Sequence, residues 1–200
     1  MTKRWISERK RDYYYRMAKQ KGYRSRAAYK LIQINHKYNV IKKGGVVVDL
    51  GAAPGGWSQV AKEIVGERGK VAAVDLQNIK PINGVKFFKG DIRDKEFIKN
   101  LLSFLDKKVD VVISDMLPKT TGSRSMDHAR SIELCEHALN FAQCVLRPKG
   151  NFIVKVFEGD LFNSYFNNLK ENFEFCKAHG PKASTKSTKE IYIIAKNFKR

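Results

Sequence analysis

An alternation of short apolar runs with helical patterns, beginning near residue 44, constrains the fold of this chain more than any other feature. The apolar runs are rich in β-branched and aromatic residues, which favours β-strands, and most are followed by a segment with helical spacing. Chains with this alternation form a mostly parallel sheet that helices cover on both faces. We therefore predict one α/β domain over residues 27–200.

The boundaries of the expected elements follow from where the periodicity changes. Strands are predicted at 45–50, 70–76, 85–91, 109–115, 151–157 and 190–198, with a weaker strand near 173–180. Helices are predicted at 56–65, 94–105, 127–146 and 161–173. For the long helix, Asp127 is the expected N-cap and the RPKG sequence at 147–150 is the expected stop signal.

Acidic residues and glycines gather where the predicted strands end, which is where open α/β sheets bind ligands. The first strand leads into DLGAAPGGW at 49–57, which is neither GxGxxG nor a phosphate-binding P-loop. Asp75 ends the second strand, Asp91 ends the third, and Asp115 ends the fourth. Each aspartate alone is more often a cap or turn residue, but the series favours a nucleoside cofactor. We expect the Asp75 carboxylate to accept hydrogen bonds from the ribose hydroxyls. We expect the Asp91 carboxylate to accept one from the adenine amino group.

A lysine, Lys155, lies in the middle of the apolar strand at 151–157. Lysine is rarely buried unless it is paired, so this position predicts carboxylate partners. Asp115 ends a strand expected to lie nearby, and Glu190 begins the last strand. Lys30 precedes the core on a predicted helix. We expect the two lysines and two carboxylates to form a nearly neutral cluster.

The charge of the chain favours a polyanionic partner. Lys and Arg number 39 against 20 Asp and Glu, a net charge of +19, which is typical of nucleic-acid-binding proteins. Residues 1–26 hold ten basic and two acidic residues, interleaved with aromatic ones such as Trp5 and Tyr13. We predict that this segment contacts nucleic acid through phosphates and unpaired bases. The alternative is a basic amphipathic helix that packs on the domain through its tyrosines.

Several classes of protein are disfavoured. The chain has three cysteines without a CxxC pair, which indicates a reducing compartment rather than a disulfide scaffold. It has neither a long apolar run nor a secretory signal, so we expect no membrane span. The spacing of His128, Cys135 and His137 matches no common zinc pattern, and we expect no metal. The expected compartment is the cytoplasm, or an organelle if a presequence was removed.

Six motifs together carry a family resemblance that spans nearly the whole chain. RSRAAYKL, VVDLGAAPGGWSQV, GDIRD, SDM, FIVKVFEGD and KEIYIIA resemble the RrmJ/FtsJ family of S-adenosylmethionine-dependent ribosomal RNA 2′-O-ribose methyltransferases. The resemblance implies a Rossmann-like methyltransferase fold with a mostly parallel seven-stranded sheet. It implies S-adenosylmethionine as cofactor and RNA as partner, most specifically a uridine ribose of large-subunit ribosomal RNA. Nothing in the sequence requires an oligomer, and we expect a monomer.

The resemblance also assigns site residues. The family's Lys-Asp-Lys-Glu tetrad falls on Lys30, Asp115, Lys155 and Glu190, with Lys155 as the proton acceptor. The cofactor-binding residues implied are Gly51, Pro54, Gly55, Gly56, Trp57, Asp75, Leu76, Asp91, Ile92 and Asp115.

Two departures from the family pattern concern the RNA substrate. The family motif SDM-APN is replaced at its end by Leu117, Pro118 and Lys119, and the stretch GPKASTKSTKE precedes the last strand. Close relatives modify tRNA anticodon loops or mRNA caps, so a tRNA substrate is an alternative. A non-enzymatic ribosome-assembly factor is a second, although all four tetrad positions are filled. A nicotinamide-dependent oxidoreductase would explain the glycine turn and Asp75 but neither Lys155 nor the charge.

Overall fold

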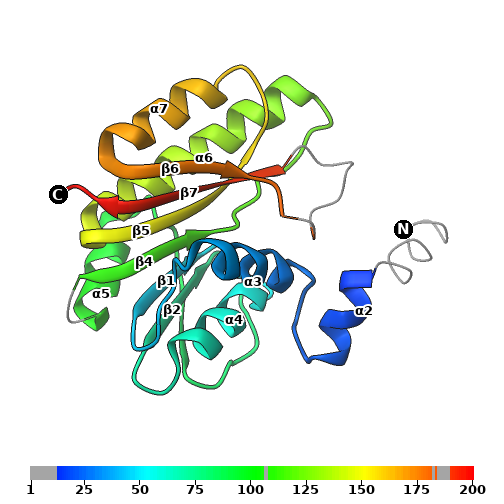
Figure 1. Ribbon diagram of the computed structural model, residues 1–200, viewed down its shortest axis with the longest axis vertical. Helices are drawn as coiled ribbons and strands as arrows, with labels where there is room; N and C mark the ends of the chain where they lie inside the picture. The colour runs from blue at the N-terminus through cyan, green and yellow to red at the C-terminus, as the bar shows by residue number, and fades with distance from the viewer. Residues whose placement is uncertain (1–12, 106–107, 182, 184–189) are drawn as a thin grey trace.

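The computed structural model of the chain describes residues 13–105, 108–181, 183 and 190–200. Its centre is a seven-stranded sheet in the order β3-β2-β1-β4-β5-β7-β6 (Figure 1). The strands are β1 Val46–Leu50, β2 Lys70–Asp75, β3 Val85–Lys89, β4 Val109–Ser114, β5 Leu146–Phe157, β6 Phe173–His179 and β7 Glu190–Phe198. Strands β1 to β5 pair in parallel, whereas β7 is antiparallel to both β5 and β6. The sheet and its helices confirm the predicted α/β, Rossmann-like architecture.

Helices cover both faces of the sheet. The helices are α2 Tyr13–Gln20, α3 Ala27–Tyr38, α4 Gly56–Val65, α5 Lys95–Leu105, α6 Arg124–Val145 and α7 Phe162–Asn172. One buried cluster joins the sheet to α5, α6 and α7, and a second joins it to α3 and α4. Helix α2 packs on α3, where the Tyr14 hydroxyl accepts a hydrogen bond from the Gln33 amide at 3.0 Å.

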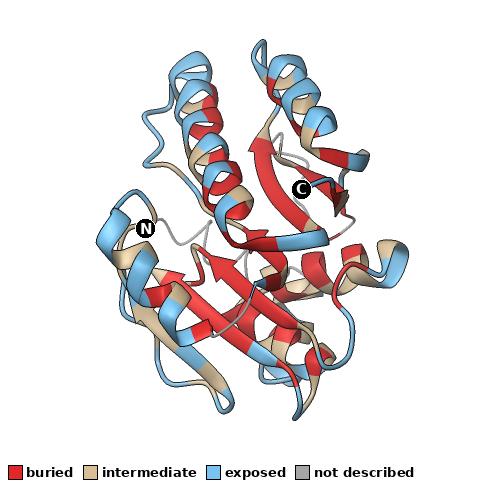
Figure 2. Cartoon of the chain, turned by 90° about the vertical axis from the view of Figure 1, so that its left-hand side faces the viewer, coloured by how far each residue is buried: buried red, intermediate tan, exposed pale blue. Residues whose placement is uncertain are grey.

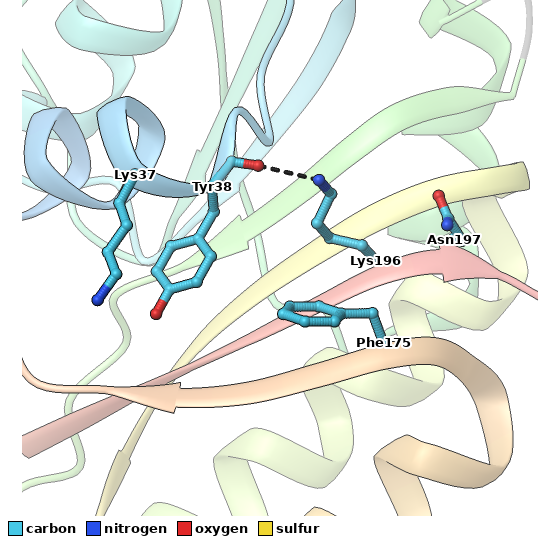
Figure 3. A pocket seen from close by; sticks show the side chains of 5 residues that line it. All are labelled: Lys37, Tyr38, Phe175, Lys196 and Asn197. Carbon is cyan, nitrogen blue, oxygen red and sulfur yellow. Dashed lines mark hydrogen bonds between the residues drawn. The ribbon is translucent and has the colours of Figure 1, made fainter.

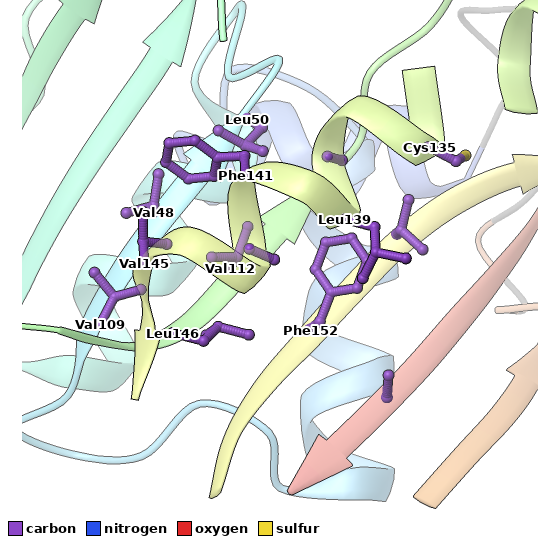
Figure 4. Close-up of a cluster of buried hydrophobic side chains, with 14 of the residues drawn as sticks. Val48, Leu50, Val109, Val112, Cys135, Leu139, Phe141, Val145, Leu146 and Phe152 are labelled. Carbon is purple, nitrogen blue, oxygen red and sulfur yellow. The ribbon is translucent and has the colours of Figure 1, made fainter. Parts of the chain in front are cut away.

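The central strands are buried on both faces, as Figure 2 shows by their red colour. In β1, Val46, Val48 and Leu50 face the α6 side, and Val47 faces the α3 and α4 side. Figure 4 shows Val48 and Leu50 near Phe141 of α6. Because both faces need apolar side chains, such strands appear in the sequence as continuous apolar runs rather than alternating ones.

The predicted elements all occur, with two corrections around α6. The helix begins at Arg124 with Ser123 as its N-cap, so the prediction that Asp127 is the N-cap was wrong. Asp127 lies in the first turn, and its carboxylate accepts hydrogen bonds from the backbone amides of Thr121 and Gly122. The residue stabilises the loop before the helix instead of capping the helix itself.

The RPKG segment also differs from the prediction. The helix ends at Val145, but the next residue already begins β5, which was expected only from residue 151. Val109 of β4 pairs with Leu146, and Val111 pairs with Asn151, so β5 bulges at this point. Lys149 has a φ of 63°, which accommodates the bulge. Proline and a turn-like sequence therefore mark an irregular strand, as bulges often do.

The expected RNA-contacting segment, residues 1–26, falls only partly within the structure, since residues 1–12 lie outside the described residues. Within the described segments, no helix has the length and apolar character needed to cross a bilayer.

Candidate active site

The glycine turn after β1 brings the chain close to the end of β4. Gly51 has a φ of 72°, and a Cβ there would lie 2.6 Å from the Met116 Cγ. The amides of Gly51 and Ala52 both donate to the Val74 carbonyl, which fixes the turn against β2. A side chain at position 51 would therefore be strained and would displace Met116.

A cavity of about 630 Å³ opens beside this turn, at the carboxyl ends of β1 to β4. Its volume lies in the range typical of small-molecule sites. The predicted cofactor residues that line it are Gly51, Pro54, Asp75, Leu76, Asp91, Ile92 and Asp115. Leu117 and Lys119, which depart from the family pattern, line it as well.

Three of the predicted cofactor residues are not among the described residues that line the cavity: Gly55, Gly56 and Trp57. A Cβ on Gly55 would lie 2.7 Å from Ile82 Cδ1, and one on Gly56 would lie 2.5 Å from Ser25 Oγ. Trp57 is buried, and its indole N–H donates a hydrogen bond to the Ala27 carbonyl at 2.8 Å. These residues pack the start of α4 against the segment before α3 and the first residue of α3, and their role in cofactor binding stays a prediction.

The two predicted adenosine contacts are already engaged by the protein. The Asp75 carboxylate accepts from the amides of Ala53 and Gln77, each at 2.8 Å, and so supports the glycine turn. Each of its oxygens keeps a lone pair for another donor. Asp91 pairs with Arg93 at 2.6 Å, and the hydrogen bonds from Arg93 lower the pKa of the carboxyl. Both aspartates are thus presented to the cavity in fixed orientations.

The predicted tetrad forms two ion pairs near the carboxyl ends of β4 and β5 and the start of β7. Lys155 is 7% exposed, and its Nζ lies 3.0 Å from Asp115 Oδ1. The same Nζ also donates to the Asp115 carbonyl at 2.8 Å. Lys30 pairs with Glu190 at 2.8 Å. The four residues come together as expected from the sequence, and Asp115 connects them to the cavity.

Tyr192 links the two ion pairs, and the sequence reasoning missed it. Its hydroxyl donates to Asp115 Oδ1 at 2.7 Å, and the Lys30 Nζ lies 5.5 Å from the centre of its ring. Burial, followed by the nearby Asp115 and Glu190, raises the pKa of this phenol well above its usual value. Tyr192 therefore stays a donor. Its position two residues after Glu190, on the same face of β7, was the available signal.

Asp49 was also missed, although it stands inside the motif. The side chain is fully buried, and Oδ2 accepts from the Ser58 hydroxyl at 2.6 Å. Oδ1 has no hydrogen-bond partner among the described residues. Burial raises the pKa of Asp49 to about 8, with Asp115 and Asp75 contributing in the same direction. An acid inside an apolar strand was the sequence signal for such a group.

Arg24 joins the segment before α3 to two loops of the cofactor cavity. Its guanidinium donates to the carbonyls of Pro54 at 3.2 Å, Lys80 at 2.5 Å and Pro81 at 2.6 Å. One side chain thereby holds the glycine turn and the loop after β2 together. The basic character of the N-terminal segment concealed this role, because any arginine there can be assigned to RNA.

The three side chains nearest to a zinc pattern in the sequence, His128, Cys135 and His137, contact other groups. His128 Nε2 accepts from the Leu161 amide at 3.0 Å, which leaves Nδ1 to donate to the Phe157 carbonyl at 3.0 Å. Burial raises the pKa of the Cys135 thiol to about 12, and this thiol donates to the Lys155 carbonyl. The described residues contain no cluster of histidine, cysteine or acidic groups arranged to hold a metal. All three cysteines are free thiols.

Curated relatives match the chain over most of its length. It is 55% identical over 190 residues to the Ribosomal RNA large subunit methyltransferase E of Methanosarcina mazei, covering 94% of this chain and 70% of that one. The protein of the same name from Methanocaldococcus jannaschii is 49% identical over 201 residues, with coverages of 98% and 82%.

A solved structure and a family model agree with these relatives. The crystal structure of a Plasmodium falciparum protein assigned as a ribosomal RNA methyltransferase superposes with a TM-score of 0.80 at 34% identity. The match covers 88% of this chain and 98% of the other. The model of the FtsJ-like methyltransferases matches residues 23–198, which include the glycine turn, the cavity and the tetrad. The chain belongs to the FtsJ-like methyltransferase family.

Proposed function

We propose that this chain transfers the methyl group of S-adenosylmethionine to a ribose 2′-hydroxyl of RNA, most specifically a uridine of large-subunit ribosomal RNA. The observation that carries the proposal is the position of Lys155, an amine paired with a carboxylate that also lines the cofactor cavity. A buried lysine beside a nucleoside site suits proton transfer from a hydroxyl. Membership of a methyltransferase family leaves a nicotinamide-dependent oxidoreductase without support.

The cavity fits S-adenosylmethionine in size and in chemistry. It is about 630 Å³, and it carries two carboxylates suited to a ribose and an adenine, those of Asp75 and Asp91. Asp115, which also lines the cavity, gives negative charge for a positively charged ligand. When bound, this cofactor supplies an electrophilic methyl group on a sulfonium.

Lys155 is placed to receive the proton of the ribose hydroxyl. A lysine head group has three hydrogen-bonding directions, and Asp115 takes two of them through its carbonyl and Oδ1. The third direction is where a hydroxyl can approach Nζ. As the uncharged amine, Lys155 accepts the hydroxyl proton while the oxygen attacks, and Asp115 then stabilises the ammonium that forms.

The second ion pair acts on the same oxygen. Lys30, held by Glu190 and lying over the Tyr192 ring, can stabilise the negative charge that develops on the ribose oxygen. The tetrad thus divides into a proton-accepting pair and a charge-stabilising pair, and Tyr192 keeps Asp115 oriented between them.

Ribosomal RNA as substrate is supported by the names of the relatives and by the charge of the chain. The relatives are named for the large-subunit RNA, and a net charge of +19 suits a large structured RNA. A reducing compartment such as the cytoplasm suits the three free thiols. We propose that the protein acts there as a monomer.

To test the proposal, the protein is incubated with radiolabelled S-adenosylmethionine and one of three substrates from cells that lack it: large ribosomal subunits, free ribosomal RNA or tRNA. A 2′-O-methyl group blocks attack of the ribose on the adjacent phosphate, so the label is mapped by its resistance to alkaline cleavage. Label at one ribose of the large-subunit RNA, lost with Lys155→Ala, is expected.

Other outcomes contradict parts of the proposal. Label confined to tRNA would keep the chemistry and reject the ribosomal substrate. Cofactor binding without methyl transfer to any of the RNAs would favour a non-enzymatic assembly factor.

A further inference from the structure

A second concentration of positive charge lies at the edge of the sheet opposite the tetrad. The parallel strands begin there. The surface is formed by the end of α3 and the segment after it, the start of β5, part of β6 and the end of β7. We call it the amino-edge surface. It comprises Lys37, Tyr38, Lys42, Lys43, Arg147, Lys149, Phe175 and Lys196.

Two adjoining cavities hollow this surface. One of about 510 Å³ is lined by Lys42, Lys43, Arg147 and Lys149, among others. A shallower one of about 330 Å³ contains Lys37, Tyr38 and Phe175. Lys196 and Asn197 line both, so the two cavities adjoin, and we refer to them together as the groove.

Positive charge in the groove exceeds the negative charge that faces it. Arg147 pairs with Asp110 at 2.5 Å, and Lys149 pairs with Glu174. Six cations less two carboxylates leave an excess of four charges. Lys42 and Lys43 are exposed and form no ion pair with another described residue. Such an excess attracts a polyanion.

Aromatic rings stand among these cations. Figure 3 shows Tyr38 of α3 facing Phe175 of β6, with Lys37 and Lys196 beside them. The ring centres of Tyr38 and Phe175 lie 6.5 Å apart, and Phe175 is 41% exposed. The Lys196 Nζ donates to the Tyr38 carbonyl at 2.9 Å, which ties the end of α3 to β7.

We propose that the amino-edge surface binds an unpaired segment of the RNA substrate away from the methylated nucleotide. The exposed ring of Phe175 can stack on an unpaired base, which a double helix would cover, and the neighbouring lysines hold the phosphates. The two sites are close enough for one RNA. Asn151 in the groove and Lys155 in the tetrad stand on the same strand, roughly 13 Å apart at ~3.3 Å per residue.

This inference rests on the proposed RNA substrate and adds a second point of contact to it. The test compares two double variants. Lys42→Gln/Lys43→Gln removes two charges from the amino-edge surface, and the control, Lys95→Gln/Lys99→Gln, removes two charges from exposed positions of α5. A third variant, Phe175→Leu, keeps an apolar side chain but removes the stacking face. The probes are a long RNA containing the methylation site with its unpaired flanks, and a short RNA limited to the target.

For the lysine variant, the affinity for the long RNA is expected to fall about 10-fold. The slope of log affinity against log salt concentration is expected to become shallower by about 1.4, because each of the two lost phosphate contacts contributes ~0.7. Phe175→Leu is expected to lose about fivefold in affinity with the slope unchanged, because stacking releases few counterions. Cofactor affinity and methylation of the short RNA stay at parental values in both. The α5 control binds the long RNA as the parent does.

Equal binding by the parent and both amino-edge variants would overturn the inference, and so would an equal loss in the α5 control. These results leave the proposed function standing if the parent still methylates RNA. Conversely, the parent protein could methylate no RNA while only the amino-edge substitutions weaken RNA binding. That result would contradict the proposed function and support the amino-edge surface as an RNA-binding site.

Discussion

Tyr192 lies directly opposite Lys155 in the antiparallel pairing of β5 with β7, and both side chains contact Asp115 Oδ1. The carboxylate is therefore held from two neighbouring strands at once. Its orientation toward Lys155 depends on a hydroxyl that no ion-pair pattern reveals.

Removing that hydroxyl is expected to slow methyl transfer more than it weakens binding. In Tyr192→Phe, Asp115 loses one donor, and a hydrogen bond to a charged group is worth about 1.5–3 kcal/mol. We expect a fall of at least about 10-fold in the single-turnover rate, with little change in cofactor affinity. Tyr165→Phe is the control, since this buried hydroxyl donates to the Cys135 carbonyl. Equal rates in the two variants would refute the role given to Tyr192.

Lys155 is expected to be needed as an uncharged amine rather than as a positive charge. Lys155→Arg keeps the cation near Asp115, but arginine is not deprotonated in proteins and cannot accept a proton. We expect both Lys155→Arg and Lys155→Ala to lose at least about 10²-fold in methylation while binding cofactor within a few-fold of the parent. Substantial turnover by Lys155→Arg would rule out the proton-accepting role.

The pair of Lys30 and Glu190 separates stability from catalysis. Removing one partner of a buried pair strands a charge, so Lys30→Met and Glu190→Leu are each expected to lower the free energy of unfolding by about 3 kcal/mol. The double variant should recover much of that loss, measured by urea denaturation. Its methylation rate should stay low, because the stabilising charge is gone. Recovery of activity along with stability would make the pair purely structural.

The contribution of Asp49 to the free energy of unfolding is expected to decline as the pH rises. The folded state holds its proton up to a pKa of about 8, whereas the unfolded chain releases it near 3.8. Between these values the unfolded state binds fewer protons, so the free energy of unfolding falls by up to about 1.4 kcal/mol per pH unit. Asp49→Asn removes this contribution and should gain stability over the parent as the pH rises from 4 to 8. Parallel curves for the two proteins would show that Asp49 is ionised in the fold.

Arg24 is expected to act on cofactor binding alone. In Arg24→Lys a single ammonium cannot reach the carbonyls of Pro54, Lys80 and Pro81 together, so the two loops lose their common anchor. We expect cofactor affinity to fall about 10-fold by calorimetry, with an unchanged rate at saturating cofactor. Arg16→Lys on α2 serves as the control. A slower rate at saturation would instead place Arg24 on the RNA path.

Features that depend on local pattern were predictable from the sequence, and features that depend on cross-strand register were not. The apolar runs located β1, β2, β4 and the inner part of β5 because buried parallel strands contain few polar residues. Lys155 was conspicuous for the same reason. In contrast, Tyr192 and Arg24 gain their roles only when distant segments pack together. Arginine is common in basic segments, so nothing distinguished Arg24. For Tyr192 the available signal was its position two residues after Glu190.

Residues of the glycine-rich motif differ in what their side chains contact. Trp57 belongs to a sequence associated with cofactor binding, but its indole is used to join α4 to the Ala27 carbonyl. A contiguous motif holds residues with different tasks, and only the packing distinguishes them. The start of β5 was missed because Pro148 and Lys149 resemble a helix end, and a bulge uses the same residue types.

The insertion of β7 between β5 and β6 has a consequence for the order in which the molecule is completed during its synthesis. Both neighbours leave the ribosome before β7 does, and they cannot pair with each other in the native arrangement. Glu190 and Tyr192 therefore arrive after Lys30, Asp115 and Lys155 have been made. At ~5–20 residues per second, the nascent chain spends several seconds with β5 at an open edge and its lysine only partly neutralised. A chain interrupted before β7 would carry the cofactor turn without a finished tetrad.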